Sequence, residues 1–425
     1  MNADSDPQPI QEDTPSDSVG QPSYDLDEYV QNYTGPIKVA RLGFIARNCA
    51  ALSERALELA IEELKKSTKN VHLYKGLVSE MQQVNPANPH AVLDNEWITT
   101  TNGHNNHQHE QLEKNLQKAS TTVVNSAIAD AHGALADYFI DSGNYSSAIR
   151  HCHQENESRV ENADNFDASK LSWLNLLSDN MSQARALSNK RLAFDDGQID
   201  EESTVKLRMI QALGYFHGGD FEDTAASILR MESTAGDPTV ASASDMAIIC
   251  ALCAMACFDR ESLKFLAHKD PTFAGLTEDV PYVREMVVCF LTSNYSRLFD
   301  LLQTYENDMK LDMYISKQLG ELYRSIRSRA MTQYLSVFSE LPISTMSATF
   351  GQDDRALLLE LKELIEQNNL NVKIDCKNEK IVLNSGVGFG EVYEKTTALA
   401  ETYRSDTRVL MWSAEVLKYP DDLAT

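Results

Sequence analysis

The amino-acid sequence predicts a mostly α-helical protein: a TPR-like right-handed helical-repeat solenoid, then a winged helix, then one C-terminal helix. Three observations support this fold class. A helix–turn–helix signature recurs between residues 134 and 300. The apolar spacing changes from helical to period two after residue 371. A helical apolar seam then returns beyond residue 391.

The N-terminal part of the chain divides into a polar tail and a helical region. Residues 1–23 are rich in Asp, Pro, Ser and Gln and lack Lys and Arg, so we expect a disordered acidic tail. Residues 24–125 are predicted to be helical, with Ser23 or Asp25 as the first cap. Within this region, the Asn-rich and Pro-containing residues 85–110 are expected to form a polar loop.

The repeat signature is clearest in "ALADYFIDSGNYSSAIRHC", residues 134–152. Small residues allow two helices to approach closely, and Asn, Asp or Gly in the turn tolerates left-handed backbone. Successive turns lie 36, 40, 39 and 35 residues apart, so residues 126–340 are predicted to be TPR-like repeats. The turns are at Asn144-Tyr145, Asn180-Met181, Asp220-Phe221, Asp259-Arg260 and Asn294-Tyr295.

The longest apolar run is "MAIICALCAMACF", residues 246–258, which is too short to span a bilayer and is predicted to be a buried core helix. Cys250, Cys253 and Cys257 share this run and are expected to pack as small apolar side chains. Seven scattered cysteines and an acidic N-terminus without an apolar leader indicate a reduced compartment, the cytoplasm or nucleus. The net charge of −25 disfavours binding to nucleic acid or to an anionic membrane at long range.

Residues 341–385 have the order of a winged helix. Pro342 begins a short helix, and "DDRALLLELKELIEQNN" forms a second helix with a leucine stripe. A hairpin follows, with candidate strands 371–376 and 380–384. Residues 386–390, "GVGFG", lack the spacing of a dinucleotide loop and are expected to be a linker. Residues 391–425 are predicted to be a C-terminal helix that joins a bundle with partner helices.

The expected protein interface lies on this hairpin and this helix. A hairpin can leave an unpaired strand edge to which a neighbouring chain adds a strand. The apolar seam of the last helix, which Asp406 interrupts, can pack against partner helices. The interface candidates are Val372, Ile374, Cys376, Ile381, Leu383, Val392, Leu399, Tyr403, Leu410 and Leu417.

No enzyme, metal or cofactor site is predicted. His104, His107 and His109 lie in "GHNNHQHE", but Ser and Asp do not follow at the spacing that a zinc isopeptidase needs. The second winged-helix helix, residues 353–368, has a net charge of −3, which disfavours reading of DNA. We therefore expect a non-catalytic protein without cofactors.

Three long segments resemble one known family. They are "DLDEYVQNYTGPIKVARLGFIARNC", "SDMAIICALCAMACFDRESL" and "MKLDMYISKQLGELYRSIRSRAMTQYL". With "SATFGQDDRALLLELKELIEQNNLNVKID", they resemble the subunit-one family of the COP-nine signalosome complex, a branch of the PCI-domain proteins. The resemblance covers about residues 24–385, and the helical part of the PCI domain would begin at about residue 207.

The resemblance implies a scaffold subunit of the complex that deneddylates the cullins of cullin–RING ubiquitin ligases. The isopeptidase would then lie in another subunit. The implied partners are other PCI subunits, with subunits two and three as the implied neighbours, and a C-terminal helical bundle. Two alternatives stay open: the paralogous PCI subunit of the proteasome lid, and a nucleic-acid-binding winged-helix protein.

Overall fold

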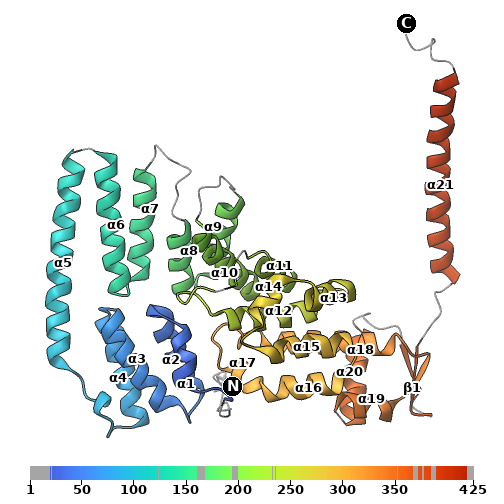
Figure 1. Ribbon diagram of the computed structural model, residues 1–425, viewed down its shortest axis with the longest axis horizontal. Helices are drawn as coiled ribbons and strands as arrows, with labels where there is room; N and C mark the ends of the chain where they lie inside the picture. Colours follow the sequence, from blue (N-terminus) through green and yellow to red (C-terminus); the bar gives the residue numbers. More distant parts are fainter. Residues whose placement is uncertain are drawn as a thin grey trace, which may run out of the picture. The chain divides into compact units, whose positions relative to one another are not determined.

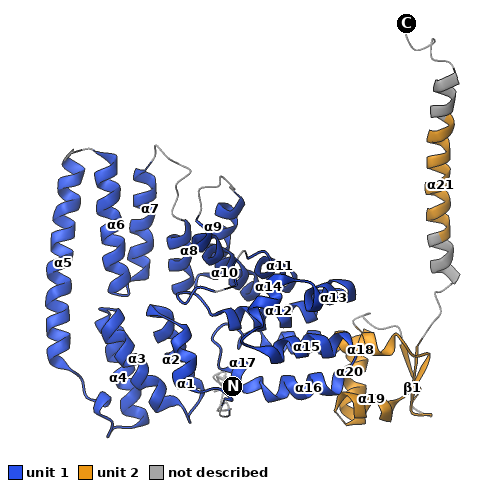
Figure 2. Ribbon diagram, in the orientation of Figure 1, with its two compact units in different colours: residues 1–327 blue, residues 328–425 orange. Residues whose placement is uncertain are grey.

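The computed structural model describes residues 20, 22–122, 124–159, 168–193, 200–231, 233–234, 236–351, 353–366, 372–375, 378–383 and 389–418. The chain divides into two compact units, residues 1–327 and 328–425 (Figure 2). Unit 1 is built from helices, and unit 2 combines helices with a small sheet. The division falls within one helix, α18 (Leu319–Leu335), ahead of the boundary predicted at residue 340. Most of the predicted disordered tail, residues 1–19 and 21, lies outside the described residues.

The first half of unit 1 contains the N-terminal helices and the first two predicted repeats (Figure 1). These elements are α1 (Leu26–Tyr29), η1 (Val30–Asn32), α2 (Gly35–Asn48), α3 (Ser53–Ser67), α4 (Val71–Val84), η2 (Pro89–Ala91), α5 (Asn95–Thr122), α6 (Asn125–Asp141), α7 (Tyr145–Ser158), α8 (Ala168–Leu177) and α9 (Met181–Ala193).

The second half of unit 1 continues the same pattern of short helices and leads into α18. Its helices are α10 (Glu201–Gly218), α11 (Phe221–Leu229), α12 (Ala243–Cys257), α13 (Arg260–His268), α14 (Pro271–Leu276), α15 (Pro281–Leu291), α16 (Tyr295–Thr304) and α17 (Glu306–Lys310).

The predicted polar loop at residues 85–110 is wrong for most of its length. Only residues 85–94 connect helices, with η2 among them, and α5 begins at Asn95. Asp94 caps this helix, because its carboxylate accepts a hydrogen bond from the backbone N–H of Trp97 at 3.0 Å. Asn and Gln without Pro are compatible with a helix when another helix packs along it, and α5 packs against α6.

The predicted repeat turns are confirmed. Each of the five predicted positions is where a second helix of a pair begins: α7, α9, α11, α13 and α16. At four of them the residue before the cap has left-handed backbone: Gly143 (φ 77°), Asp179 (φ 59°), Gly219 (φ 81°) and Ser293 (φ 60°).

The same four turns share one hydrogen bond. The N–H of the capping residue donates to the carbonyl five residues earlier, as Asn144 does to Phe139 at 2.8 Å and Asn294 to Cys289 at 2.9 Å. This six-to-one bond closes the preceding helix in a Schellman motif, and the same residue is the N-cap of the next helix. One turn therefore ends one helix and fixes where its partner begins.

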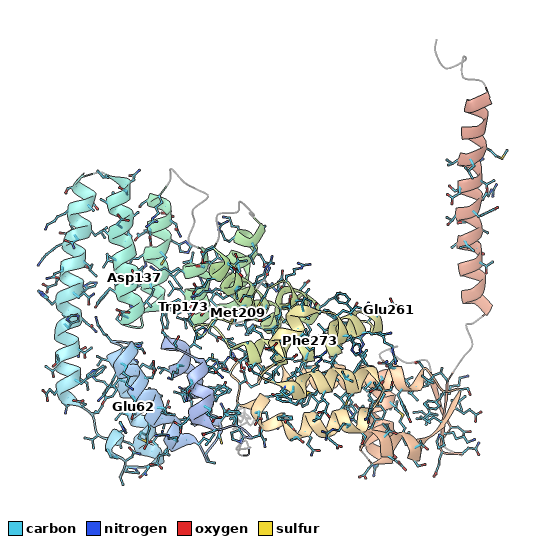
Figure 3. All side chains as sticks on the ribbon, viewed as in Figure 1. Glu62, Asp137, Trp173, Met209, Glu261 and Phe273 are labelled. Atoms are coloured by element: carbon cyan, nitrogen blue, oxygen red, sulfur yellow. The ribbon has the colours of Figure 1, made fainter. Side chains whose placement is uncertain are left out.

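Consecutive helices of unit 1 pack side by side: α5 on α6, α6 on α7, α8 on α9, and α10 on α11 (Figure 1). Met209 of α10 and Phe273 of α14 are buried between the packed helices (Figure 3). Asp137 of α6 is on the surface, where its carboxylate forms an ion pair with Lys170 at 2.6 Å. None of the described helices is both long enough and apolar enough to cross a membrane.

The apolar run at residues 246–258 forms α12, which is buried as predicted. Cys250 and Cys253 are buried, and burial raises the pKa of both thiols, so they stay protonated and pack as apolar groups. Cys257 is exposed, which corrects its predicted place in the core. It is at the last position of α12, where the chain turns toward α13.

A buried ionic cluster joins three segments of unit 1 that are far apart in the sequence. Arg41 of α2, only 2% exposed, donates to the Asp245 carboxylate of α12 at 2.7 Å. It also donates to Asp312, which follows α17, at 2.6 Å, and to the Tyr29 hydroxyl at 2.7 Å. The guanidinium lies 4.3 Å from the centre of the Tyr33 ring, and the Tyr33 hydroxyl donates to Asp245.

The two carboxylates of this cluster also accept bonds from neighbouring backbone. Asp312 accepts from the N–H groups of Tyr314 and Ile315 at 2.8 and 3.0 Å. Asp245 forms a capping box with Ser242 at the start of α12. The cluster therefore compensates two buried carboxylates with one guanidinium, a hydroxyl and several N–H groups.

We predict that Arg41→Gln lowers the free energy of unfolding by about 3–5 kcal/mol, because it leaves Asp245 and Asp312 buried without a cation. Arg41→Lys is expected to lose less, because an ammonium keeps the charge but cannot bridge both carboxylates as a planar fork does. Urea unfolding followed by circular dichroism measures both variants.

The matched control is Arg55→Gln. Arg55 is an exposed cation that pairs with Asp27 at 2.9 Å and Glu58 at 3.1 Å, so its loss should cost at most about 1 kcal/mol. Equal losses for Arg41→Gln and Arg55→Gln would show that the buried cluster contributes no more than a surface ion pair.

A pair of histidines lies between α6 and α7. The Nδ1 atoms of His132 and His151 are 3.1 Å apart. Burial lowers the pKa of both imidazoles, and for His151 the neighbouring His132 adds to the effect. The unfolded chain therefore binds protons more readily than the folded chain as the pH falls below about 6.5.

We predict that the melting temperature falls as the pH is lowered from 7.5 to 5.5, because these imidazoles are protonated on unfolding. His132→Asn should reduce the size of this fall. His268→Asn, at an exposed histidine of α13, should leave it unchanged. The measurement is differential scanning fluorimetry in buffers of equal ionic strength. A pH dependence unaltered in His132→Asn would contradict the assignment.

Candidate assembly interface

Unit 2 has the element order of a winged helix, as predicted. After α18 come β1 (Glu340–Pro342), α19 (Ile343–Phe350), α20 (Asp354–Glu366), β2 (Val372–Asp375), β3 (Lys380–Leu383) and α21 (Phe389–Lys418). Gly351, with φ 63°, ends α19 in the left-handed conformation. Pro342 caps α19, which agrees with its predicted role at the start of that helix.

The strands form one antiparallel sheet in the order β1-β3-β2. Ile381 of the central strand is opposite Leu341 on one side and Ile374 on the other. The core beneath the sheet comes from α19 and α20, including Met346, Phe350, Leu357, Leu361 and Leu364. Leu358 and Ile365 of the predicted leucine stripe are only partly buried.

The sheet order corrects the prediction for one of the two strands that were expected to offer an unpaired edge. Strand 380–384 was expected to be available for pairing, but β3 is the central strand and is paired on both sides. Val372 and Ile381 are buried in unit 2, at 6% and 1% exposure, so their side chains cannot contact a partner. Ile374 and Leu383 are partly buried, and Cys376 lies outside the described residues.

The two edge strands of the sheet are β1 and β2, and the geometry of β2 identifies the backbone groups that its outer edge offers. The N–H of Leu383 donates to Ser339, on the β1 side of β3. In antiparallel strands, the backbone N–H and C=O groups of two opposed residues either both point toward the other strand or both point away from it. Val372 is opposite Leu383 and Ile374 is opposite Ile381, so both point their N–H and C=O away from β3. Lys373 and Asp375 point their backbone groups toward β3.

The second part of the predicted interface is α21. Its described side chains, residues 396–411, are all exposed. Among them are three members of the predicted seam: Leu399 (74%), Tyr403 (76%) and Leu410 (69%). Val409 and Met411 add exposed apolar surface beside Leu410. The side chains of Val392 and Leu417, and residues 386–388 of the predicted linker, lie outside the described residues.

The helix α20 corresponds to the predicted recognition helix. Its surface carries Glu360, Glu363 and Glu366 beside Lys362, which forms an ion pair with Glu366 at 3.6 Å. A helix that enters the major groove needs cations for the phosphates. The described surface of α20 carries more acidic than basic side chains.

The three histidines of "GHNNHQHE" lie in α5 and have separate neighbours. His104 is 3.3 Å from the Lys69 ammonium, His107 contacts Gln111 at 2.8 Å, and His109 packs against Tyr138. Over the ranges that the structure describes, no three His, Cys, Asp or Glu side chains are close enough to hold a metal ion.

Two family models match the chain. Residues 94–266 match the model described as 26S proteasome subunit RPN7, and residues 302–385 match the PCI domain. The PCI match spans α18, the winged helix and the end of unit 1. Where the helical part of the domain begins, predicted at about residue 207, stays a prediction.

Similarity to curated relatives extends over most of the chain. COP9 signalosome complex subunit 1 of Schizosaccharomyces pombe is 29% identical, over 84% of this chain and 84% of the relative. The Arabidopsis thaliana protein of the same name is 24% identical, over 93% and 90%. The 26S proteasome non-ATPase regulatory subunit 6 of Dictyostelium discoideum is 21% identical, over 90% and 93%. Residues 302–385 thus match the PCI domain, and most of the chain is similar to subunit 1 of the COP9 signalosome. The proteasome subunits are more distant.

We predict that Ile381→Ala destabilises unit 2 by about 2–5 kcal/mol, because it empties a fully buried position in the central strand. Val382→Ala, on the other face of the same strand and only partly buried, is the matched control and should cost less. Hydrogen exchange of the β1–β3 amides measures the local effect. Equal loss of protection in both variants would place the core of unit 2 elsewhere.

Proposed function

We propose that this protein is a non-catalytic scaffold subunit of the COP9 signalosome. The proposal rests on the resemblance to signalosome subunit 1 over most of the chain. The complex acts on neddylated cullins of cullin–RING ubiquitin ligases, and its isopeptidase lies in another subunit. The partners of this chain are other PCI subunits, with subunits two and three as its neighbours. It works in the cytoplasm and nucleus, without nucleic acid or membrane as a partner.

Assembly uses two surfaces of unit 2. A strand of a neighbouring subunit pairs with the free edge of β2, through the backbone groups of Val372 and Ile374. The apolar seam of α21 packs into a helical bundle with the C-terminal helices of other subunits. The strength of the first contact comes from main-chain hydrogen bonds, and that of the second from burial of Leu399, Tyr403 and Leu410.

The strand contact is tested by Ile374→Pro, which removes one outward-facing N–H. The matched control is Ile374→Ala, which also shortens the side chain but keeps the N–H. In reconstitution with the other signalosome subunits, we expect Ile374→Pro to be incorporated at least about fivefold less well than Ile374→Ala, because a Pro also blocks close approach of the added strand.

Native mass spectrometry of the reconstituted mixture gives the incorporated fraction of each variant. Equal incorporation of Ile374→Pro and Ile374→Ala would exclude the β2 edge as an interface. Retained hydrogen-exchange protection in α19 and α20 of the free variant shows that unit 2 is still folded.

The helix contact is tested by Leu399→Asp combined with Leu410→Asp. Burying two carboxylates in an apolar bundle is unfavourable, so we expect incorporation to be nearly abolished. Glu401→Ala with Arg408→Ala changes two exposed residues of the same helix outside the seam and should have little effect. If both double variants are incorporated like the unchanged chain, α21 is not an assembly element.

Activity separates scaffold from enzyme. The purified chain alone should release no modifier from a neddylated cullin, and a reconstituted complex that contains it should do so. Release by the chain alone that is abolished by a chelator would overturn the non-catalytic assignment. Incorporation into a proteasome lid in place of the signalosome would favour the paralogous alternative.

A further inference from the structure

A groove of about 850 Å³ in unit 1 has no role in the assembly described above. It lies between the N-terminal segment at residues 23–32, the start of α12, the start of α15 and the segment at residues 305–315. Three of these segments, the N-terminal one, the start of α12 and residues 305–315, are joined by the Arg41 cluster, which holds these parts of the lining together.

The lining of the groove is strongly acidic. Asp25, Glu28, Asp279 and Asp308 line it, and no Lys, Arg or His is among the lining residues. The carboxylate of Asp308 accepts a hydrogen bond from the backbone N–H of Ser23 at 2.8 Å, but hydrogen bonds from neutral groups leave its charge in place. Within the described residues, none of these four carboxylates forms an ion pair across the groove.

The charge of the deeper lining is already compensated. Asp245 and Asp312 also reach the groove, but both are bonded to Arg41. The excess negative charge therefore belongs to the four outer carboxylates. This charge also acts on the aromatic lining: burial raises the pKa of Tyr282, and the negative charge of Asp308 raises it further.

The groove is also aromatic. Tyr282 and Tyr305 are stacked, with ring centres 3.8 Å apart and an angle of 10° between the planes. Tyr24 and Tyr29 form a second stacked pair at 4.6 Å. All four rings are partly exposed and line the groove. Aromatic faces next to carboxylates favour a planar cation, which stacks on a ring while its edge donates to oxygen atoms.

We propose that this groove binds an arginine-containing segment of a basic partner protein. Arginine fits better than lysine, because a guanidinium is planar and donates in a fork that matches carboxylate oxygens. The chain's own N-terminal residues 1–19 are a poor occupant, because they are acidic and contain no Lys or Arg. The binding site is in unit 1 and is independent of the β2 edge and of α21.

The test uses the full-length chain and a fluorescein-labelled hexapeptide, Gly-Arg-Ala-Arg-Gly-Arg. Binding is followed by fluorescence anisotropy in 0.15 M salt. At this ionic strength the Debye length is about 8 Å, so long-range attraction of the peptide to the acidic chain is screened. The same peptide with citrulline in place of each arginine keeps the shape and removes the charge. We expect saturable binding of the arginine peptide and none of the citrulline peptide.

Variants assign the binding to the groove. Glu28→Gln with Asp279→Asn should weaken binding about fivefold to tenfold, because two exposed carboxylates of the lining are neutralised. Glu222→Gln with Asp223→Asn removes the same charge from the exposed start of α11 and should change affinity less than twofold. Tyr282→Leu, which keeps an apolar side chain but removes the ring, should weaken binding about fivefold.

Three outcomes would overturn the proposal. Equal weakening by the two acidic double variants would mean that the peptide responds to net charge only. If neither the Tyr282→Leu variant nor the Glu28→Gln/Asp279→Asn variant changes the affinity for the peptide, the binding site lies elsewhere. A more than tenfold gain in affinity on deletion of residues 1–19 would show that the chain's own N-terminus occupies the groove.

Discussion

The guanidinium of Arg41 is the constraint on which the arrangement of unit 1 depends. It connects α2 with α12 and with the residues after α17, across 204 and 271 positions of sequence. Taking one cation and two carboxylates out of water is unfavourable unless their hydrogen-bonding capacity is used. Here the Tyr29 and Tyr33 hydroxyls, the Ser242 cap and two backbone N–H groups satisfy much of this capacity, whereas the buried Nε of Arg41 has no hydrogen-bond partner among the described residues. The N-terminal helices are thereby held against the later repeats.

The three separate stretches of sequence that carry the family resemblance are also the ones that supply the cluster. The first quoted segment contains Tyr29, Tyr33 and Arg41, the second contains Asp245, and the third contains Asp312. Each segment supplies a charged side chain whose burial is unfavourable unless the other segments supply its partners. Repeated helix pairs need only similar apolar surfaces and turns, so their sequences can diverge, whereas a buried cluster requires particular side chains at particular positions.

Much of the fold was predictable because local chemistry determines it. The Asn or Asp of each repeat turn and the residue before it define the ends of two helices, and the change to period two after residue 371 identifies the hairpin. The β3 position in the centre of the sheet was not predictable, because β1 is three residues long and pairs through contacts distant in sequence. The helix at residues 95–122 was not predictable because its several Asn residues and Gly103 have low helix propensity, and its packing on α6 outweighs that preference.

The candidate interface was predicted in part for a similar reason. A sequence pattern identifies the apolar face of a strand but not whether that face packs on the protein's own core or on a partner, so the pattern predicts Val372 and Ile381 as contacts although their side chains belong to the core. The acidic groove could not be found from the sequence, because Glu28, Asp279 and Asp308 come from three separate segments. The clustering of Tyr24 and Tyr29 near the N-terminus was the available signal.

The two proposed assembly surfaces supply different kinds of recognition. Main-chain bonds at the β2 edge can form with any extended segment of suitable length, so by themselves they hardly discriminate between neighbours. The α21 seam presents Leu399, Tyr403 and Leu410 with a charged residue, Asp406, between them. Shape and charge at such a seam select the register and the partner helix. A subunit with both surfaces can join related PCI neighbours through a common backbone contact while the helix determines its place among them.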